Sequence, residues 1–137
     1  MPYKINEYEN ISVIKIAVRG RNLEQFFTDA FLGTLYLMKP FQKFTTEKTE
    51  REIFIEAIDA TSLLVQFLNE VLSMARSNKE SYNNIIFYKI QPTSLRAKLF
   101  AVSVESFHRE INTLDYHNAE VRQVEGGAWE TTIIFNQ

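Results

Sequence analysis

Two hydrophobic periods alternate along this chain, and their order limits the folds that it can adopt. Every second side chain is apolar within residues 12–19, and this alternation predicts a half-buried strand. From Asn22 to Pro40 the apolar residues recur at helical spacing, and Asn22 followed by Gln25 is typical of a capping box at a helix start. This part of the chain is therefore predicted to be a strand that leads into an amphipathic helix.

The same two patterns then follow each other again. Residues 51–57 alternate and are rich in β-branched side chains, which predicts a second strand. Asp59 is a natural N-cap for a second amphipathic helix, which we expect to fray within the polar run 76–81. Four later segments rich in Val, Ile, Phe and Tyr are predicted to be strands, most of them paired as hairpins: 84–90, 95–104, 119–124 and 129–135.

The order of these elements indicates the fold class. Strand, helix, strand and helix, followed by several strands, favour an α+β fold in which two helices pack on a largely antiparallel or mixed β-sheet. Apolar residues make up 45% of the chain and charged residues 23%, which is typical of a globular protein. No repeat or linker divides the sequence, so we expect a single domain over residues 1–137.

Charge and cysteine content exclude several classes of function. The chain has 15 basic and 17 acidic residues and a net charge of −2, so it lacks the overall positive charge that is typical of nucleic-acid-binding proteins. We therefore expect RNA to be bound only indirectly. It has no cysteine, which excludes disulfides and thiolate zinc sites. No run approaches the roughly 18 apolar residues of a membrane-spanning helix, so we expect a cytoplasmic protein without a membrane segment.

The residues offer little that is typical of catalysis. There is no glycine-rich phosphate loop, no metalloprotease motif and no nucleophile elbow. His108 and His117 are the only imidazoles; a hydrolase or metal site built on either is an alternative, and we favour surface residues. Glu7 and Glu9 offer oxygens to a hard cation, and Trp129 offers a stacking surface, although solvated carboxylates and packing are the interpretations we prefer.

Four segments, in the same order and over nearly the whole chain, resemble the archease family. They are Glu9 to Glu24, similar to that family's first strand and helix start; Asp59 to Glu70, similar to a family helix, with Phe67 in place of a Trp; Tyr116-His117-Asn118-Ala119-Glu120-Val121; and Gly126-Gly127-Ala128-Trp129 to Phe135, similar to its final strand. The resemblance implies an archease-like two-layer α+β fold. It also implies a working surface that includes Glu9, Asn112, His117 and Trp129.

The resemblance implies a function that is not enzymatic. Archeases are protein cofactors of an RNA-splicing ligase, and they promote its guanylylation and repeated turnover in tRNA splicing or RNA repair. The expected partner is therefore such a ligase. The alternative is a degenerate interaction module that has kept the archease fold but has lost metal binding and ligase activation.

The family's divalent-cation site, of calcium type, is changed in this chain. Val13 stands where the family has an Asp in its first strand, and Asn136 and Gln137 occupy the C-terminal ligand positions. A Val cannot ligate, and an Asn offers only a neutral oxygen, so that only the α-carboxylate of Gln137 keeps a charge. Asn112 falls where the family has a Lys. We therefore expect an eroded metal site and no bound cofactor.

Overall fold

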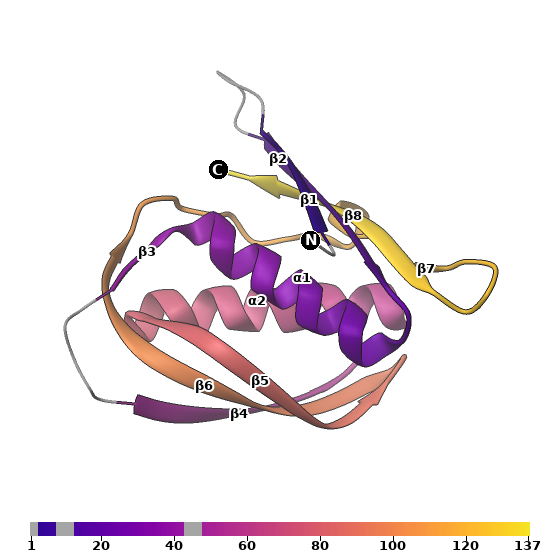
Figure 1. The fold of residues 1–137 in the computed structure, drawn as a ribbon, viewed down its shortest axis with the longest axis horizontal. Coiled ribbons are helices and arrows are strands. Elements are labelled where there is room, and N and C mark those ends of the chain that lie inside the picture. Colours follow the sequence, from indigo (N-terminus) through magenta and orange to yellow (C-terminus); the bar gives the residue numbers. More distant parts are fainter. Residues whose placement is uncertain (1–2, 8–12, 43–47) are drawn as a thin grey trace.

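The computed structural model describes residues 3–7, 13–42 and 48–137, and it places two helices between two β-sheets (Figure 1). The helices are α1 (Leu23–Met38) and α2 (Ala60–Asn78). The first sheet contains β1 (Tyr3–Glu7), β2 (Val13–Gly20), β8 (Trp129–Asn136) and β7 (Arg122–Gln123), in that order. The second contains β3 (Pro40–Gln42), β4 (Lys48–Glu56), β5 (Glu80–Gln91) and β6 (Ser94–Phe107).

The α+β class and both predicted helices are confirmed, and the structure adds that the strands form two sheets. Every strand pairing among the described residues is antiparallel. In the second sheet, β6 pairs with each of β3, β4 and β5. None of the helices in the described ranges is long and apolar enough to cross a membrane.

The predicted helix starts are confirmed by their hydrogen bonds. The Asn22 side chain accepts a hydrogen bond from the Gln25 amide at 2.8 Å, and the Gln25 side chain accepts one from the backbone of Arg21. Asp59 likewise accepts from the Ser62 amide at 2.8 Å. These bonds satisfy backbone donors that the first helical turn leaves free.

The inward-facing side chains of the two helices form much of the hydrophobic core. The rings of Phe27 and Phe31 lie 5.8 and 6.0 Å from the ring of Phe67, centroid to centroid, so that α1 and α2 interlock through aromatic side chains. All three rings are fully buried. The alternation of β2 supplies the other wall, because Ile14, Ile16 and Val18 point inward.

Several features differ from the sequence prediction. β1 and β3 were not predicted, and β5 begins at Glu80, within the polar run where the helix was expected to fray. Glu80 is buried because Arg51 of β4 binds its carboxylate with two nitrogens and Tyr82 donates a hydrogen bond to it at 2.8 Å. A partner on another strand therefore makes a polar residue suitable for the interior.

The strand predicted over residues 119–124 is largely wrong. Only Arg122–Gln123 pairs as β7, and a short 3-10 helix, η1 (Tyr116–Asn118), precedes it. The backbone there is bound by threonine hydroxyls: the amide of Val121 donates to Thr61, and Thr131 donates to the carbonyl of Glu120, both at 2.8 Å. Side-chain partners thus replace a strand ladder.

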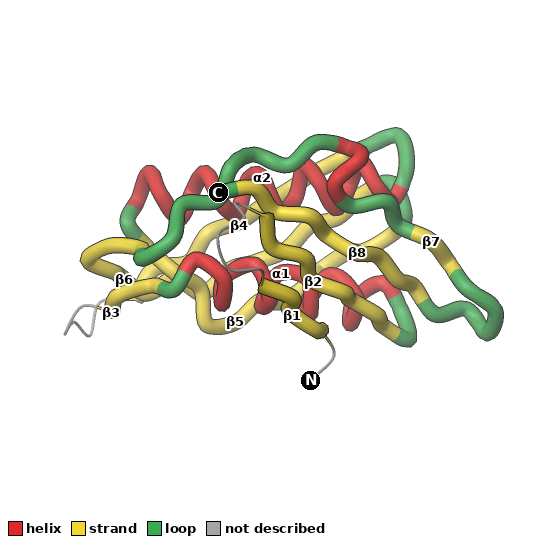
Figure 2. Tube along the Cα trace, turned by 90° about the horizontal axis from the view of Figure 1, so that it is seen from above, coloured by secondary structure: helices red, strands yellow, loops and turns green. Residues whose placement is uncertain are grey.

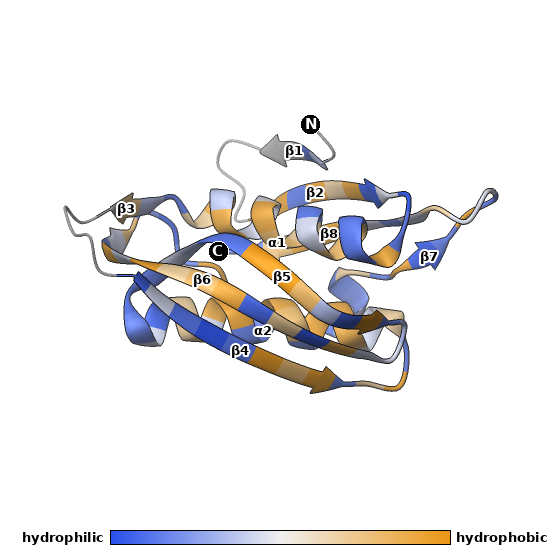
Figure 3. Ribbon diagram, turned by 60° about the horizontal axis from the view of Figure 1, so that its bottom comes forward, coloured by the Kyte–Doolittle hydropathy of each residue, from blue (hydrophilic) through white to orange (hydrophobic). Residues whose placement is uncertain are grey.

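Apolar and polar residues both occur along β4, β5 and β6 (Figure 3), and large side chains on the outer face of this sheet are exposed. Phe54 on β4 and Tyr88 on β5 are 62% and 50% exposed. The cations of Arg96 and Lys98, on β6, lie 5.8 and 5.9 Å from the centre of the Tyr88 ring. The inner face of the same sheet buries Leu95, Ala97 and Leu99 against the helices, as alternation along β6 requires.

Candidate functional site

Three positions that the sequence places on separate segments meet at one corner of the first sheet. Val13 of β2 is the direct cross-strand partner of Asn136 of β8. The backbone amide of Asn112 donates a hydrogen bond to the carbonyl of Asn136 at 2.8 Å. We call Val13, Asn112 and Asn136 the corner.

The corner faces away from the helices. Ile14 and Phe135, the next residues along each strand, are buried, so Val13 and Asn136 project from the opposite face of the pleated sheet. Asn112 and Asn136 are exposed, and Val13 is half-buried. The corner is therefore accessible to a partner molecule.

Helix α2 holds the segment that carries Asn112. The side-chain amide of Asn69 donates to the carbonyl of Leu114 at 2.9 Å and accepts from its amide at 2.7 Å. About two turns further along α2, the Arg76 guanidinium donates to the carbonyl of Ile111 at 2.9 Å. Two helix side chains thus fix the backbone on both sides of Asn112, and Figure 2 shows this segment running beside α2.

The continuation of this segment is fixed at the start of α2. The Tyr116 hydroxyl donates to the carboxylate of Asp59 at 2.7 Å, and this hydrogen bond raises the pKa of Tyr116. Asp59 also caps α2 through its other carboxylate oxygen. One side chain therefore both starts the helix and holds the segment 108–121 against it.

The donor groups of the corner do not fit a hard divalent cation. Val13 offers a hydrocarbon, and the side chains of Asn112 and Asn136 offer neutral amides, whereas calcium prefers several anionic oxygens. Within the part of the chain that the structure describes, no three His, Asp or Glu side chains gather closely enough to hold a metal ion. The corner is suited to hydrogen bonding with a partner.

Two other residues of the expected working surface, Trp129 and His117, lie away from the corner. Trp129 pairs with Gly20 at the opposite end of β8, and its half-buried ring packs on the core. The His117 side chain is 88% exposed, and its Nδ1 lies 3.9 Å from a carboxylate oxygen of Glu120. Glu9 lies outside the described residues, and Gln137 follows Asn136 and is exposed.

The two histidines have no arrangement that suggests catalysis. The His108 ring packs against the ring of Phe41, with 4.9 Å between centroids, and its backbone amide donates to the carbonyl of Lys39. The neighbours of His117 are Glu120 and the Tyr116 ring. A nucleophile, a base and an orienting group are not seen together at either imidazole within the described ranges.

Residues that position the corner were missed by sequence reasoning. Asn69 stands in the Leu-Asn-Glu segment that resembles the archease family, but its role as a clamp on Leu114 depends on a contact across 45 residues. In the sequence Arg76 belongs to a polar run, whereas in the structure its guanidinium donates to a carbonyl 35 residues away. The sequence offered one hint for Asn69: its amide side chain lies on the half-buried side of a predicted helix, where it needs a hydrogen-bond partner.

Comparison with solved structures defines the class of this fold. The chain resembles the solution structure of protein 1598 of Methanobacterium thermoautotrophicum, with a TM-score of 0.65 and 18% identity over 99% of both chains. It also resembles the crystal structure of an archease, described as a possible chaperone, from Thermotoga maritima, with a TM-score of 0.63 and 15% identity over 96% of both chains. The fold is thus that of the archeases.

Sequence comparison identifies the family. The profile of the Archease protein family matches residues 8–136. The chain is also 25% identical to the protein archease of Methanosarcina mazei over 150 aligned positions, which cover 98% of each chain. The chain belongs to the archease family.

Proposed function

We propose that this protein is a non-enzymatic cofactor of an RNA-splicing ligase, and that it promotes guanylylation and turnover of the ligase in tRNA splicing or RNA repair in the cytoplasm. One observation carries the proposal. Val13, Asn112 and Asn136, the positions that take functional residues in the family, converge at one exposed corner. This convergence supports the corner as the surface that binds the ligase, although the side chains differ from those of the family.

The chemistry of the corner favours binding over bond-making. Amide side chains donate and accept hydrogen bonds, and they do not serve as nucleophiles or as general bases near neutral pH. The Asn112 backbone is held from both sides by Asn69 and Arg76, so its side chain is presented from a fixed position. Preorganised groups of this kind lower the ordering cost of partner binding.

A second candidate is a degenerate module that binds a partner without activating it. The half-buried hydrocarbon of Val13 beside Asn136 favours it, because an apolar side chain next to an amide suits a protein contact better than a cation. Under this alternative the corner still docks on a protein. Ligase guanylylation is then unaffected.

A time course of ligase guanylylation separates the two candidates. The cognate ligase is mixed with GTP, metal and either this protein or its Val13→Asp/Asn136→Asp variant, and covalent guanylylation is followed. We expect partial stimulation by the unaltered protein and greater stimulation by the variant. Full stimulation by the unaltered protein would show that the lost carboxylates are dispensable.

Absence of stimulation by both proteins supports the degenerate module. A pull-down of the ligase then tests whether docking persists. The double variant Lys15→Asp/Ile134→Asp is the matched control, since these residues are the next cross-strand pair on the same face of the sheet. We expect no gain of stimulation from this control, because its carboxylates lie one row away from Asn112.

A further inference from the structure

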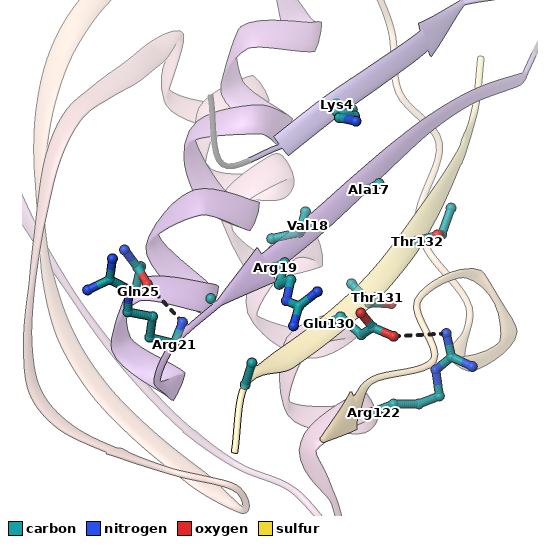
Figure 4. Close-up of a pocket in the computed structure, with 12 residues that line it drawn as sticks. Lys4, Ala17, Val18, Arg19, Arg21, Gln25, Arg122, Glu130, Thr131 and Thr132 are labelled. Atoms are coloured by element: carbon teal, nitrogen blue, oxygen red, sulfur yellow. Dashed lines mark hydrogen bonds and ion pairs between the residues drawn. The ribbon is translucent and has the colours of Figure 1, made fainter. Parts of the chain in front are cut away.

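The open face of the first sheet carries a shallow trough at the end away from the corner (Figure 4). Its volume is about 700 Å³. Small side chains on neighbouring strands, Ala17 of β2 and Thr132 of β8, form its floor as cross-strand partners. The trough therefore lies directly on the sheet, where no other part of the described chain covers it.

Long cationic side chains surround this floor. Lys4 of β1, Arg19 of β2, Arg21 beyond β2 and Arg122 of β7 all line the trough, and Glu130 is the single acidic residue among the lining residues. Arg122 pairs with Glu130 at 3.3 Å. The trough thus has a local positive charge within a chain whose net charge is −2.

Three of these cations have no ionic partner within the described ranges. Lys4, Arg19 and Arg21 make no side-chain salt bridge there. Like charges held close together repel one another, and the repulsion is relieved when an anion binds between them. Because they have no ionic partner among the described residues, these cations favour an anionic ligand in the trough.

The register of the strands sets the cations in two successive rows. Lys4 is aligned with Ala17, which is aligned in turn with Thr132. Arg19 is aligned with Glu130, which pairs with Arg122 of β7. Because the rows are two residues apart along β2, about 7 Å separates them. An extended anionic chain placed along β2 meets cations from both rows.

The lining chemistry favours phosphate over a protein segment. Protein interfaces are typically anchored by Trp and Tyr as well as Arg, and the lining residues include no aromatic side chain, Val18 being the largest apolar one. Contacts to a nucleic-acid backbone use Arg and Lys together with Thr and Gln side chains, and Thr132 and Gln25 supply such groups here. Arg side chains also bind phosphate through two parallel hydrogen bonds.

We propose that this trough binds the phosphates of a single RNA strand without reading its bases. Lys15, the next outward residue of β2, continues the positive charge from the trough towards Val13. A bound strand is therefore directed along β2 to the corner. This inference goes beyond the proposed function, because it assigns direct RNA contact to the protein itself and does not depend on a ligase.

Fluorescence anisotropy with a labelled twelve-nucleotide oligouridylate and the protein alone tests the proposal. We expect binding that weakens as salt is raised from 50 to 200 mM, with a logarithmic slope of roughly −2 to −3 for three or four neutralised phosphates on a single strand. Arg19→Glu and Lys4→Glu should each lower affinity at least tenfold. Arg19→Gln should have a smaller effect in the same direction.

The matched control is Lys89→Glu, which reverses an exposed cation on β5 of the other sheet. We expect it to leave affinity unchanged, and circular dichroism checks that each variant is folded. Absence of binding by the unaltered protein at 50 mM salt, or an equal loss in the Lys89 variant, overturns the proposal. Equal competition by polyglutamate of matched charge also overturns it, in favour of an acidic protein segment.

Discussion

Val13 and Asn136 lie opposite each other in β2 and β8, on the face of the sheet that the helices leave open. Cβ atoms of such antiparallel partners are about 4.5 to 5.5 Å apart. Carboxylates at both positions are therefore close enough to share one cation. With Val13 and Asn136 in place, the corner lacks both of these carboxylates.

We predict that the variant Val13→Asp/Asn136→Asp gains affinity for calcium or manganese, measured by isothermal titration calorimetry. The unaltered protein should show weak binding or none at millimolar metal, while the variant gains anionic oxygens of the type that calcium prefers. The control Lys15→Asp/Ile134→Asp, one row away on the same face, should gain less. A tight site in the unaltered protein would contradict this prediction.

The second prediction concerns Asn69, which clamps Leu114. Asn69→Ala removes two hydrogen bonds to the buried Leu114 backbone and should lower the free energy of unfolding by roughly 1 to 3 kcal/mol. Gln66→Ala, an exposed residue of the same helix, should change it by less than about 0.5 kcal/mol. Urea denaturation measures both, and equal effects would show that the clamp is dispensable.

The third prediction tests the aromatic core. Phe67 is fully buried against the rings of Phe27 and Phe31, so Phe67→Ala should cost about 3 to 5 kcal/mol. Phe54→Ala removes the same atoms from a residue that is 62% exposed on β4, and it should cost less than about 1 kcal/mol. Chemical denaturation compares the two variants. A small effect at Phe67 would mean that the core repacks around the cavity.

The fourth prediction concerns the pH dependence of stability. Asp29 on α1 is 7% exposed, its Oδ2 has no hydrogen-bond partner in the described structure, and burial raises its pKa above 3.8. Because the folded state then disfavours the charged form, this residue destabilises the protein increasingly as pH rises through the raised pKa. Asp29→Asn should therefore raise the urea midpoint at pH 7, and the gain should vanish as pH falls below 3.8.

Glu24→Gln is the control for this titration. Glu24 is exposed in the first turn of the same helix, where a negative charge interacts favourably with the helix dipole. Its neutralisation should lower stability at pH 7 by less than about 1 kcal/mol, opposite in sign to the effect at Asp29. A destabilised Asp29→Asn protein at pH 7 would show that the ionised carboxylate is well solvated.

Local patterns predicted the elements that local interactions determine. The strand beginning near Val13 and both helices follow from apolar periodicity, and Asn22 and Asp59 mark the helix starts because a cap binds backbone only three residues away. Glu80 could not be assigned in this way, since its burial depends on Arg51 across 29 residues. From sequence alone, a charged side chain is expected to be exposed, because the partner that allows its burial is not known.

The sequence indicated candidate residues for the site, but it did not indicate how the chain brings them together. Resemblance to the archeases indicated Val13 and Asn136, and strand register then made them neighbours. The clamps Asn69 and Arg76 have no local signature, because both bind backbone carbonyls of a distant segment. Trp129 was grouped with this surface because its Gly-Gly-Ala-Trp segment resembles the family, yet it stands at the far end of β8 from Asn136.

The pairing of β2 with β8 has a consequence for biosynthesis. Val13 and Asn136 are about 120 residues apart in sequence, so their contact closes one of the longest loops in the molecule. Contacts of large sequence separation are slow to form, whereas the β5 and β6 hairpin closes over a short turn. During translation the corner cannot assemble until β8 has left the ribosome. A partner that recognises the corner therefore binds only a chain in which β2 and β8 have both been made and have paired.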